Sequence, residues 1–275
     1  MSVMDRRTWM KYASLGGLSI CGCFNGCKTA PITGRRQMMF YPEQQEVAMG
    51  KQSFTDVVSK EVASTNSRFQ LLVERVGRRI ADVSGHSEYE WETKVVASEE
   101  QNAFCLPGGK IVVYEGILPV CENEAGLAVV MSHEVAHVLA RHGGERMSQT
   151  AAVNGIQTGV GYLLRNKEQV TQELWNRAYG ISSNYGFLLP YSRKHETEAD
   201  HIGLMLMAQA GYDPVEAPRF WARFGAAGQS AKPPEFLSTH PSDSRRATDL
   251  EKLLPQALEG YRQAVNPIGQ GEVIV

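Results

Sequence analysis

The stretch from residue 122 to residue 149 constrains the fold of this chain most strongly, because it places polar residues on a helix that should be buried. Apolar residues recur at spacings of three and four from Leu127 to Leu139, which is the period of a helix with an apolar face. Gly143 and Gly144 follow and offer a natural interruption. We therefore expect a buried helix that ends shortly before these two glycines.

The polar residues on this helix form the motif HEVAH. His133 and His137 lie four residues apart, so on a helix they project from nearly the same face, one turn apart. Glu134 stands between them, and in an HExxH arrangement two imidazoles hold zinc while the carboxylate acts as a general base. A lone histidine would be interpreted as a satisfied core residue. Two histidines and a glutamate in this spacing instead predict a zinc site, and that site still needs a third ligand.

A second helical stretch supplies a candidate for that ligand. Glu196 and Asp200 lie four residues apart and share a helix face. Glu196 would complete a His-His-Glu set and leave one position for water. Asp200 would accept a hydrogen bond from the free ring nitrogen of a ligand histidine. Glu198 lies between them and is expected to point into solvent.

The spacing argues against one alternative zinc geometry. The pattern HExxHxxGxxH needs a glycine and a further histidine at positions that hold Ala140 and Gly143 here. His142 is one residue away from the required place, which turns it away from the ligand face. We interpret His142 as a helix-end residue, and the site as the His-His-Glu, or gluzincin, type.

The first thirty residues have the composition of an export leader. An arginine pair at residues 6–7 is followed by an apolar run at residues 12–20 and then by cysteines among glycines. The pair resembles a twin-arginine signal, and a general secretory leader is the open alternative. We expect an exported bacterial envelope protein, periplasmic and tethered to a membrane by a lipid on Cys23 or Cys27. An uncleaved or simply secreted terminus is the competing interpretation.

The rest of the chain predicts an α+β fold that is mostly helical. Residues 43–63 and 68–83 have helical spacing, whereas residues 91–97 and 110–114 have the composition of strands. The strands come directly before the HExxH helix, so we expect a small β-sheet packed on that helix.

Composition limits the domains and partners. The formal net charge of -2 gives no indication of nucleic acid binding, and no stretch after the leader approaches eighteen continuous apolar residues. We expect a leader and tether at residues 1–30, a single domain at residues 31–263 that begins with a linker at residues 31–42, and a tail at residues 264–275.

Two cysteines lie in the body of the chain. Cys105 and Cys121 could form a disulfide in an oxidising compartment or remain separate buried thiols, and both possibilities are open. The region at residues 150–190 is interpreted as scaffold, with a loop at residues 180–191 that could cover the site.

Four blocks of this sequence resemble one known family. The resemblance covers residues 30–260, and the family is the HtpX-like and CAAX-prenyl-protease-like zinc metallopeptidases, metallopeptidase family forty-eight. The greatest likeness is to its soluble branch with BepA, LoiP and the OMA-type protease. The blocks are NAFCLPGGKIVVYEGIL, ENEAGLAVVMSHEVAHVLARH, YSRKHETEADHIGL and STHPSDSRR.

The resemblance implies roles for particular residues. His133, His137 and Glu196 match the zinc ligands of the family, with one zinc ion per chain. Glu134 matches its general base and Asp200 the acid of its ExxxD element. His240 matches a catalytic histidine that contacts the substrate carbonyl or transiently the zinc.

Further residues of the resemblance bear on the substrate. Arg193 is expected to be a structural and substrate-binding arginine, and Arg245 or Arg246 a structural one. A metallopeptidase holds its substrate extended, and an exposed strand edge does this by backbone pairing. Residues 102–104, which are Asn102, Ala103 and Phe104, are predicted to form that edge. A plain hairpin turning at residues 108–109 is the open alternative.

The expected function is zinc-dependent endoproteolysis. The expected substrates are misfolded or unassembled envelope proteins, which makes the chain a protein quality control enzyme. A zinc-stabilised chaperone or assembly factor of the envelope, with little proteolysis, is the alternative, because the same zinc residues would occur in both.

Overall fold

Helices surround a small sheet in this chain, for which a computed structural model describes residues 27–158, 175, 191–227, 236–240 and 245–274. The strands are β1 (Cys27–Thr29), β2 (Arg36–Met38), β3 (Glu92–Val96), β4 (Ala103–Leu106) and β5 (Lys110–Tyr114). The helices are α2 (Glu43–Lys60), α3 (Ser67–Val83), η2 (Glu115–Ile117), α4 (Leu118–Cys121), α5 (Glu124–Leu139), α6 (His142–Thr158), α9 (Arg193–Gln209), α10 (Glu216–Ala227), α11 (Phe236–Thr239) and α12 (Arg246–Arg262).

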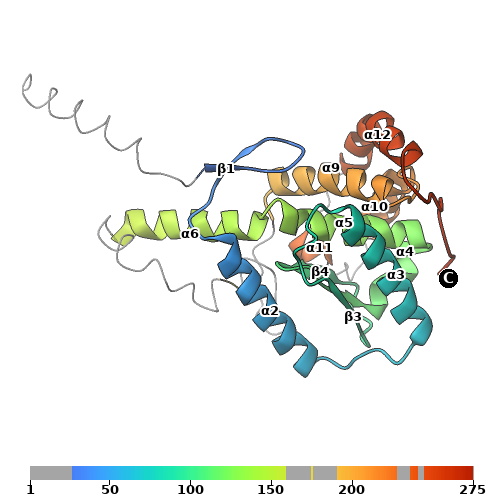
Figure 1. Ribbon diagram of the computed structural model, residues 1–275, viewed down its shortest axis with the longest axis horizontal. Coiled ribbons are helices and arrows are strands. Elements are labelled where there is room, and N and C mark those ends of the chain that lie inside the picture. Colours follow the sequence, from blue (N-terminus) through green and yellow to red (C-terminus); the bar gives the residue numbers. More distant parts are fainter. Residues whose placement is uncertain (1–26, 159–174, 176–190, 228–235, 241–244, 275) are drawn as a thin grey trace, which may run out of the picture.

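Helix α5 lies at the centre of the described fold (Figure 1). Every side chain from Glu124 to Val138 is buried, as expected for a helix that is apolar on all sides and enclosed by other elements. Helices α3, α9 and α10 and strand β4 pack against it. The side chain of Asn123 accepts a hydrogen bond from Gly126 N at 2.9 Å and so caps the first turn. The predicted architecture, mostly helical with a small sheet on the HExxH helix, is confirmed.

The sheet that packs on α5 has the order β3-β5-β4. Strands β3 and β5 are parallel, and β4 and β5 are antiparallel with Ala103 opposite Val113. Gly108 and Gly109 make the turn between β4 and β5 with φ of 87° and 81°, a conformation that favours glycine. Strand β4 is therefore one arm of a hairpin and also an edge of the described sheet, and pairing of a substrate with this edge stays a prediction.

The close approach of α9 to α5 depends on a glycine. A Cβ atom on Gly203 would lie 3.0 Å from the backbone nitrogen of His133 and 3.1 Å from its Cα. The two helix backbones are therefore in direct contact one turn beyond Asp200. This contact determines how far the first turn of α9 stands from the HExxH residues of α5.

Helix α5 ends shortly before Gly143, as expected, but the two glycines do not make the interruption. Gly143 and Gly144 lie inside α6, and the break occurs at Arg141, whose φ is 51°. The guanidinium of Arg141 donates to Oε1 of Glu46 and to the carbonyl of Tyr41, which stabilises this conformation. A Cβ on Gly144 would lie 2.4 Å from the Glu46 carboxylate, so the glycine makes room for that carboxylate within a helix.

Both ends of the described chain pack on the body. Part of the expected linker is ordered as β2, which pairs with β1 in an antiparallel hairpin that places Thr29 opposite Arg36. Near the other end, Glu124 N donates to Glu272 O at 2.8 Å and Ile274 N donates to Glu122 O at 2.8 Å. The segment expected as a tail therefore contacts the start of α5.

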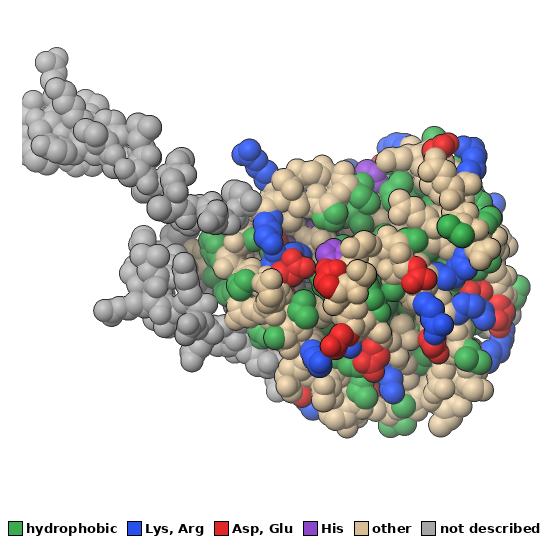
Figure 2. Space-filling view, in the orientation of Figure 1, with side chains coloured by type: hydrophobic (Ala, Val, Ile, Leu, Met, Phe, Trp, Pro, Cys, Tyr) green, Lys and Arg blue, Asp and Glu red, His purple; other side chains and the backbone are tan. Residues whose placement is uncertain are grey.

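Several other features bear on the sequence predictions. Cys105 and Cys121 are both buried and free, so the two-thiol alternative is confirmed. Most of the expected scaffold region and loop, residues 159–174 and 176–190, lies outside the described residues. Within the described ranges no helix has both the length and the apolar character needed to cross a membrane. On the face shown in Figure 2, acidic and basic side chains are interspersed, without the one-signed basic stripe that suits nucleic acid.

The contact at Gly203 makes a prediction about stability. Replacing Gly203 with Val forces the α9 and α5 backbones apart and is expected to lower the free energy of unfolding by about 1–3 kcal/mol, measured by urea denaturation. Gly260→Ala in α12 is the control, because its Cβ would meet only Gln209 Cγ at 3.6 Å and alanine favours a helix. Equal stability of Gly203→Val and the unmodified protein would contradict the proposed contact.

Candidate metal centre

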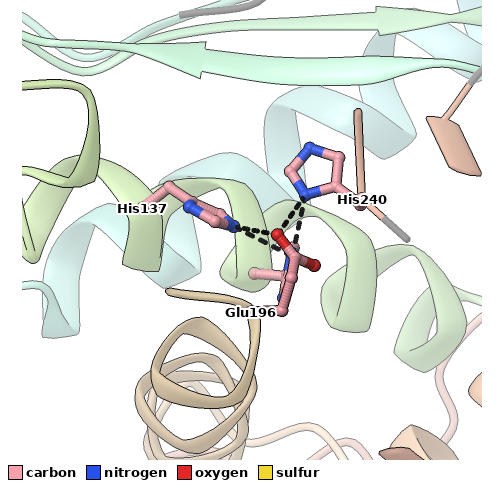
Figure 3. Close-up of side chains that lie close together, drawn as sticks. His137, Glu196 and His240 are labelled. Atoms are coloured by element: carbon pink, nitrogen blue, oxygen red, sulfur yellow. Dashed lines mark hydrogen bonds and ion pairs between the residues drawn. The ribbon is translucent and has the colours of Figure 1, made fainter. Parts of the chain in front are cut away.

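Elements far apart in the sequence bring four side chains to one point (Figure 3). His133 and His137 come from α5, Glu196 from the first turn of α9, and His240 directly follows α11. Nε2 of His133 lies 3.1 Å from Nε2 of His137 and 3.4 Å from Oε2 of Glu196, and Nε2 of His137 lies 3.4 Å from Oε1 of Glu196. All four side chains are buried.

The other ring nitrogens show which atoms face this point. Nδ1 of His133 lies 3.1 Å from Oδ1 of Asp200, and Nδ1 of His137 lies 2.9 Å from Nδ1 of His142. A neutral imidazole has a single N–H, and if each ligand ring uses it at Nδ1, both Nε2 atoms present lone pairs. Two lone pairs 3.1 Å apart in a buried site repel one another unless a cation lies between them.

These atoms suit a zinc ion. With metal–nitrogen distances of about 2.0–2.1 Å, two ligand atoms of a tetrahedral zinc ion are about 3.3 Å apart, close to the separations of 3.1–3.4 Å found among His133, His137 and Glu196. Imidazole nitrogen and carboxylate oxygen are also the ligand atoms that zinc takes. Oε2 of Glu196 is buried and accepts no hydrogen bond from the described residues, although it forms an ion pair with Arg246 Nη1 at 3.1 Å. Its lone pairs can therefore be shared between that arginine and a metal.

His240 lies against both the ligand atoms and the predicted general base. Its Nδ1 is 3.2 Å from Nε2 of His133 and 3.1 Å from Oε1 of Glu196, and its Nε2 is 3.3 Å from Oε1 of Glu134. The ring stacks on Phe236 with centroids 4.5 Å apart. Phe236 in turn contacts the segment that directly precedes strand β4, because its N–H donates to Gln101 O at 3.1 Å.

The surroundings shift the pKa values of the two carboxylates, Glu134 and Glu196, in opposite directions. Burial raises the pKa of Glu134 to about 7, which is suited to taking and returning a proton near neutral pH. Burial also opposes ionisation of Glu196, but His240 and Arg246 outweigh it and hold the pKa of Glu196 well below its usual range. Burial keeps the pKa of His137 well below its usual value. The geometry thus favours an ionised Glu196 and a neutral His137, the forms that bind metal.

Asp200 lies beside a ligand histidine, as the sequence predicted, and it also pairs with an arginine, which the sequence did not predict. Besides its contact with His133, Asp200 accepts a hydrogen bond from Arg246 Nε at 2.8 Å. The guanidinium of Arg246 lies 3.3 Å from the ring centroid of Trp221, so it is packed as well as paired. Of the two arginines that the sequence left open, Arg246 contacts the site through Asp200 and Glu196.

The predicted substrate-binding residues occupy two different places. Ala103 and Phe104 are buried in edge strand β4, next to α5. The side chain of Asn102 accepts the Ala103 N–H at 2.9 Å, which caps a backbone donor at that edge. Arg193 is exposed at the start of α9 and lines a pocket with Arg246. That pocket is also lined by Glu196 and Asp200 but by none of residues 102–104, so Arg193 and the β4 edge lie in different places.

Two residues of the site were misjudged from the sequence. Glu198 was expected in solvent but is buried, with His142 Nε2 2.9 Å from its Oε2. His142 was expected to turn away from the ligands but is fully buried and contacts His137. The reason is the break at Arg141, where φ is 51°, because α6 then starts at His142 and the ring of His142 lies against the ligand histidine. In the sequence, the acidic stretch ETEAD at residues 196–200 was the only available signal that His142 could have a carboxylate partner.

Comparisons with known proteins agree with this geometry. The chain matches the family described as Peptidase family M48 over residues 67–254. It is 42% identical over 238 residues to the "Mitochondrial metalloendopeptidase OMA1" of Schizosaccharomyces pombe, covering 85% of this chain and 68% of that protein. It is 30% identical to the protein of the same name from Saccharomyces cerevisiae, covering 96% of this chain and 79% of that protein. It is also 26% identical to the "Beta-barrel assembly-enhancing protease" of Escherichia coli K12, covering 69% of this chain and 41% of that protein.

The ionised Glu198 predicts a pH dependence of stability. Burial opposes its ionisation, but hydrogen bonds from His142, Arg35 and Thr33 lower its pKa from 4.5 to about 2. Because the pKa is lower in the folded state, this carboxylate stabilises the fold above pH 4.5, and the stabilisation is lost as the pH falls through about 2.

The measurement is urea unfolding of the zinc-free protein at pH 5 and pH 3. Glu198→Gln is expected to be less stable than the unmodified chain at pH 5, and the difference should shrink by roughly half at pH 3. Glu74→Gln, on the exposed face of α3, serves as the control. A difference that is the same at both pH values would contradict an ionised, paired Glu198.

Proposed function

Because the chain belongs to Peptidase family M48 and is a zinc metalloendopeptidase, we propose that it hydrolyses misfolded or unassembled proteins of the cell envelope. The observation that carries the catalytic part is the convergence of His133, His137 and Glu196 on one buried point beside Glu134. The substrate part is supported by the strand edge that lies next to this point.

We assign zinc to His133, His137 and Glu196, with His240 completing the set in the described arrangement. When bound, zinc acts as a Lewis acid that polarises a carbonyl and lowers the pKa of water. Asp200 keeps the ring of His133 in the tautomer whose Nε2 is free for the metal. Arg246 holds Asp200 ionised and in place.

Glu134 performs the proton transfers in this proposal. Its pKa of about 7 allows it to accept a proton from water during attack on the peptide carbonyl and to return it to the leaving amine. The Nε2 atom of His240, 3.3 Å from Glu134 Oε1, can donate to the oxygen that becomes negative. Both groups act within a buried site, where electrostatic interactions are stronger than in water.

His240 must move before the enzyme can work on a substrate. A catalytic zinc site keeps one position open, but here Nδ1 of His240 stands among the ligand atoms of His133 and Glu196. The open position expected from the sequence is thus filled in this arrangement. We propose that it is a closed form, and that an entering substrate displaces the imidazole to the side of the carbonyl.

The neighbouring edge determines which substrates fit. Substrate would pair with the outer edge of β4, where, among the described residues, Ala103 N donates to the side chain of its neighbour Asn102. Only an extended segment can pair in this way, and a folded protein rarely presents one. This favours unfolded or unassembled polypeptides, with Asn102, Ala103 and Phe104 as the contacting residues. We assign Arg193 a separate contact with a more distant part of the substrate.

The envelope location rests on the leader. We propose that residues 1–30 direct export and tether the chain through Cys23 or Cys27, ahead of the catalytic domain at 31–263 and the tail at 264–275. Residues 1–26, and Cys23 with them, lie outside the described residues, whereas Cys27 begins strand β1. The name of the Escherichia coli relative, an assembly-enhancing protease, supports an envelope substrate.

The role of Glu134 can be tested by replacing it with Gln. Glu134→Gln is expected to bind zinc as the unmodified protein does and to lose at least about a hundredfold in kcat on unfolded casein, because the base is absent. Zinc content and casein hydrolysis are the measurements, with Glu74→Gln as the control. Cleavage at the unmodified rate would remove Glu134 as the base. A Glu134→Gln protein that still performed its role in cells would instead favour the chaperone function.

The role of His240 can be tested with a ring that keeps the packing. His240→Phe retains an aromatic ring against Phe236 but removes both nitrogens, so zinc affinity is expected to fall by roughly tenfold. With zinc in excess, kcat/KM should also fall by about tenfold or more, because the oxyanion loses a donor. Chelator competition and steady-state kinetics give the two values, and Leu71→Phe, at an exposed position of α3, is the control. Unchanged zinc affinity would mean that His240 is not a ligand, and unchanged kcat/KM that it has no catalytic role.

A further inference from the structure

A chain of polar contacts runs from the zinc ligand His137 to the N-terminal hairpin. Nδ1 of His137 lies 2.9 Å from Nδ1 of His142, Nε2 of His142 lies 2.9 Å from Oε2 of Glu198, and Arg35 Nε donates to the same oxygen at 2.7 Å. The four residues come from α5, α6, α9 and the β1–β2 hairpin. Residues far apart in the sequence are thus connected by one continuous series of polar contacts.

Each nitrogen in this line has one role. Glu198 is an acceptor only, so Nε2 of His142 carries the proton and donates to it. A neutral His142 then has a lone pair at Nδ1, which accepts the N–H of His137 Nδ1. That leaves Nε2 of His137 with a lone pair directed at the metal position. The tautomer that zinc requires of His137 is therefore set by Glu198, one imidazole further away.

The line is also held rigidly. His142 is fully buried, and the side chain of Glu198 is 4% exposed. Arg35 spans Glu198 and Glu145, with its two terminal nitrogens 2.8 Å and 2.6 Å from the Glu145 oxygens. Thr33 also donates to Glu198. Buried ions left without partners are costly, so Glu198 has little freedom to turn away from His142.

The arrangement parallels the support of the other ligand histidine. His133 contacts Asp200, which is paired with Arg246, so an arginine, a carboxylate and an imidazole stand in that order. At His137 the order is the same with His142 inserted. The difference is that Arg35 lies outside residues 67–254, the part of the chain that matches the family.

We propose that His142, Glu198 and Arg35 are positioning residues that orient His137 for zinc, so that the N-terminal hairpin completes the metal site. This inference rests on the proposed zinc site of His133, His137 and Glu196. It makes the segment next to the leader part of the catalytic machinery. Displacing the hairpin would then weaken zinc binding without touching a ligand.

The test compares two neighbouring arginines of the hairpin. Arg35→Ala removes the partner of Glu198, whereas Arg36→Ala removes an exposed side chain from the next position. Zinc affinity is measured by competition with a chromogenic chelator, and each variant is also loaded with cobalt, whose visible absorption reports the ligand geometry. Arg35→Ala is expected to bind zinc at least tenfold more weakly and to change the cobalt spectrum. Arg36→Ala should stay within twofold of the unmodified protein.

A purely structural role for Arg35 gives a different result. It would lower the unfolding temperatures of the zinc-free and zinc-loaded proteins equally, while leaving zinc affinity and the cobalt spectrum unchanged, and this result would overturn the inference. If Arg35→Ala does not fold, the same measurements on Arg35→Lys decide. That variant keeps the charge but loses the fork that spans two carboxylates, and an affinity within twofold of the unmodified protein would again overturn the inference.

The same experiment separates this inference from the zinc assignment. His137→Ala is measured beside the arginine variants. If His137→Ala binds zinc as tightly as the unmodified chain, the proposed zinc site fails, and the inference fails with it. If His137→Ala loses zinc while Arg35→Ala retains it with an unchanged spectrum, only the positioning role fails.

Discussion

Two imidazole nitrogens face one another in the core of this protein, and the rest of the structure depends on that contact. Nε2 of His133 and Nε2 of His137 lie 3.1 Å apart, and each ring uses its other nitrogen elsewhere. A helix as apolar as α5 is stable in the centre of the fold, but its histidines are stable there only with a cation and fixed partners. Helices α6, α9 and α12 and the residue that follows α11 supply those partners.

His133 and His137 receive their partners in different ways, and the difference has a structural cause. Helix α9 lies directly on α5 through Gly203, so Asp200 reaches His133 without an intermediate. His137 is one turn further along α5, where Glu198 does not contact its ring directly and His142 stands between the two. The gap is filled because the helix breaks at Arg141 and α6 starts at once with His142. A zinc site that looks simple in sequence thus needs an extra imidazole and the N-terminal hairpin.

The site has its general base in place, but His240 occupies the position that a substrate would need. Glu134 is buried at a pKa of about 7, and strand β4 packs against the helix that carries it, so the group for proton transfer lies beside the edge that we propose for an extended chain. His240 nevertheless stands among the ligand atoms. Since α11 is short and is attached to the sheet side through Phe236 and Gln101, binding of a polypeptide at that edge is well placed to shift it. Closure and substrate binding would then be linked through the same segment.

Much of this protein can be predicted from its sequence because helix periodicity and side-chain spacing are local properties. The apolar period identified α5, the four-residue spacings placed His133 with His137 and Glu196 with Asp200, and strand composition located β3 and β5. Burial of Glu198 and His142 could not be predicted in this way, since it depends on what packs over them. Only the tertiary structure decided that Arg35, more than 100 residues away in sequence, is the partner that makes a buried carboxylate stable.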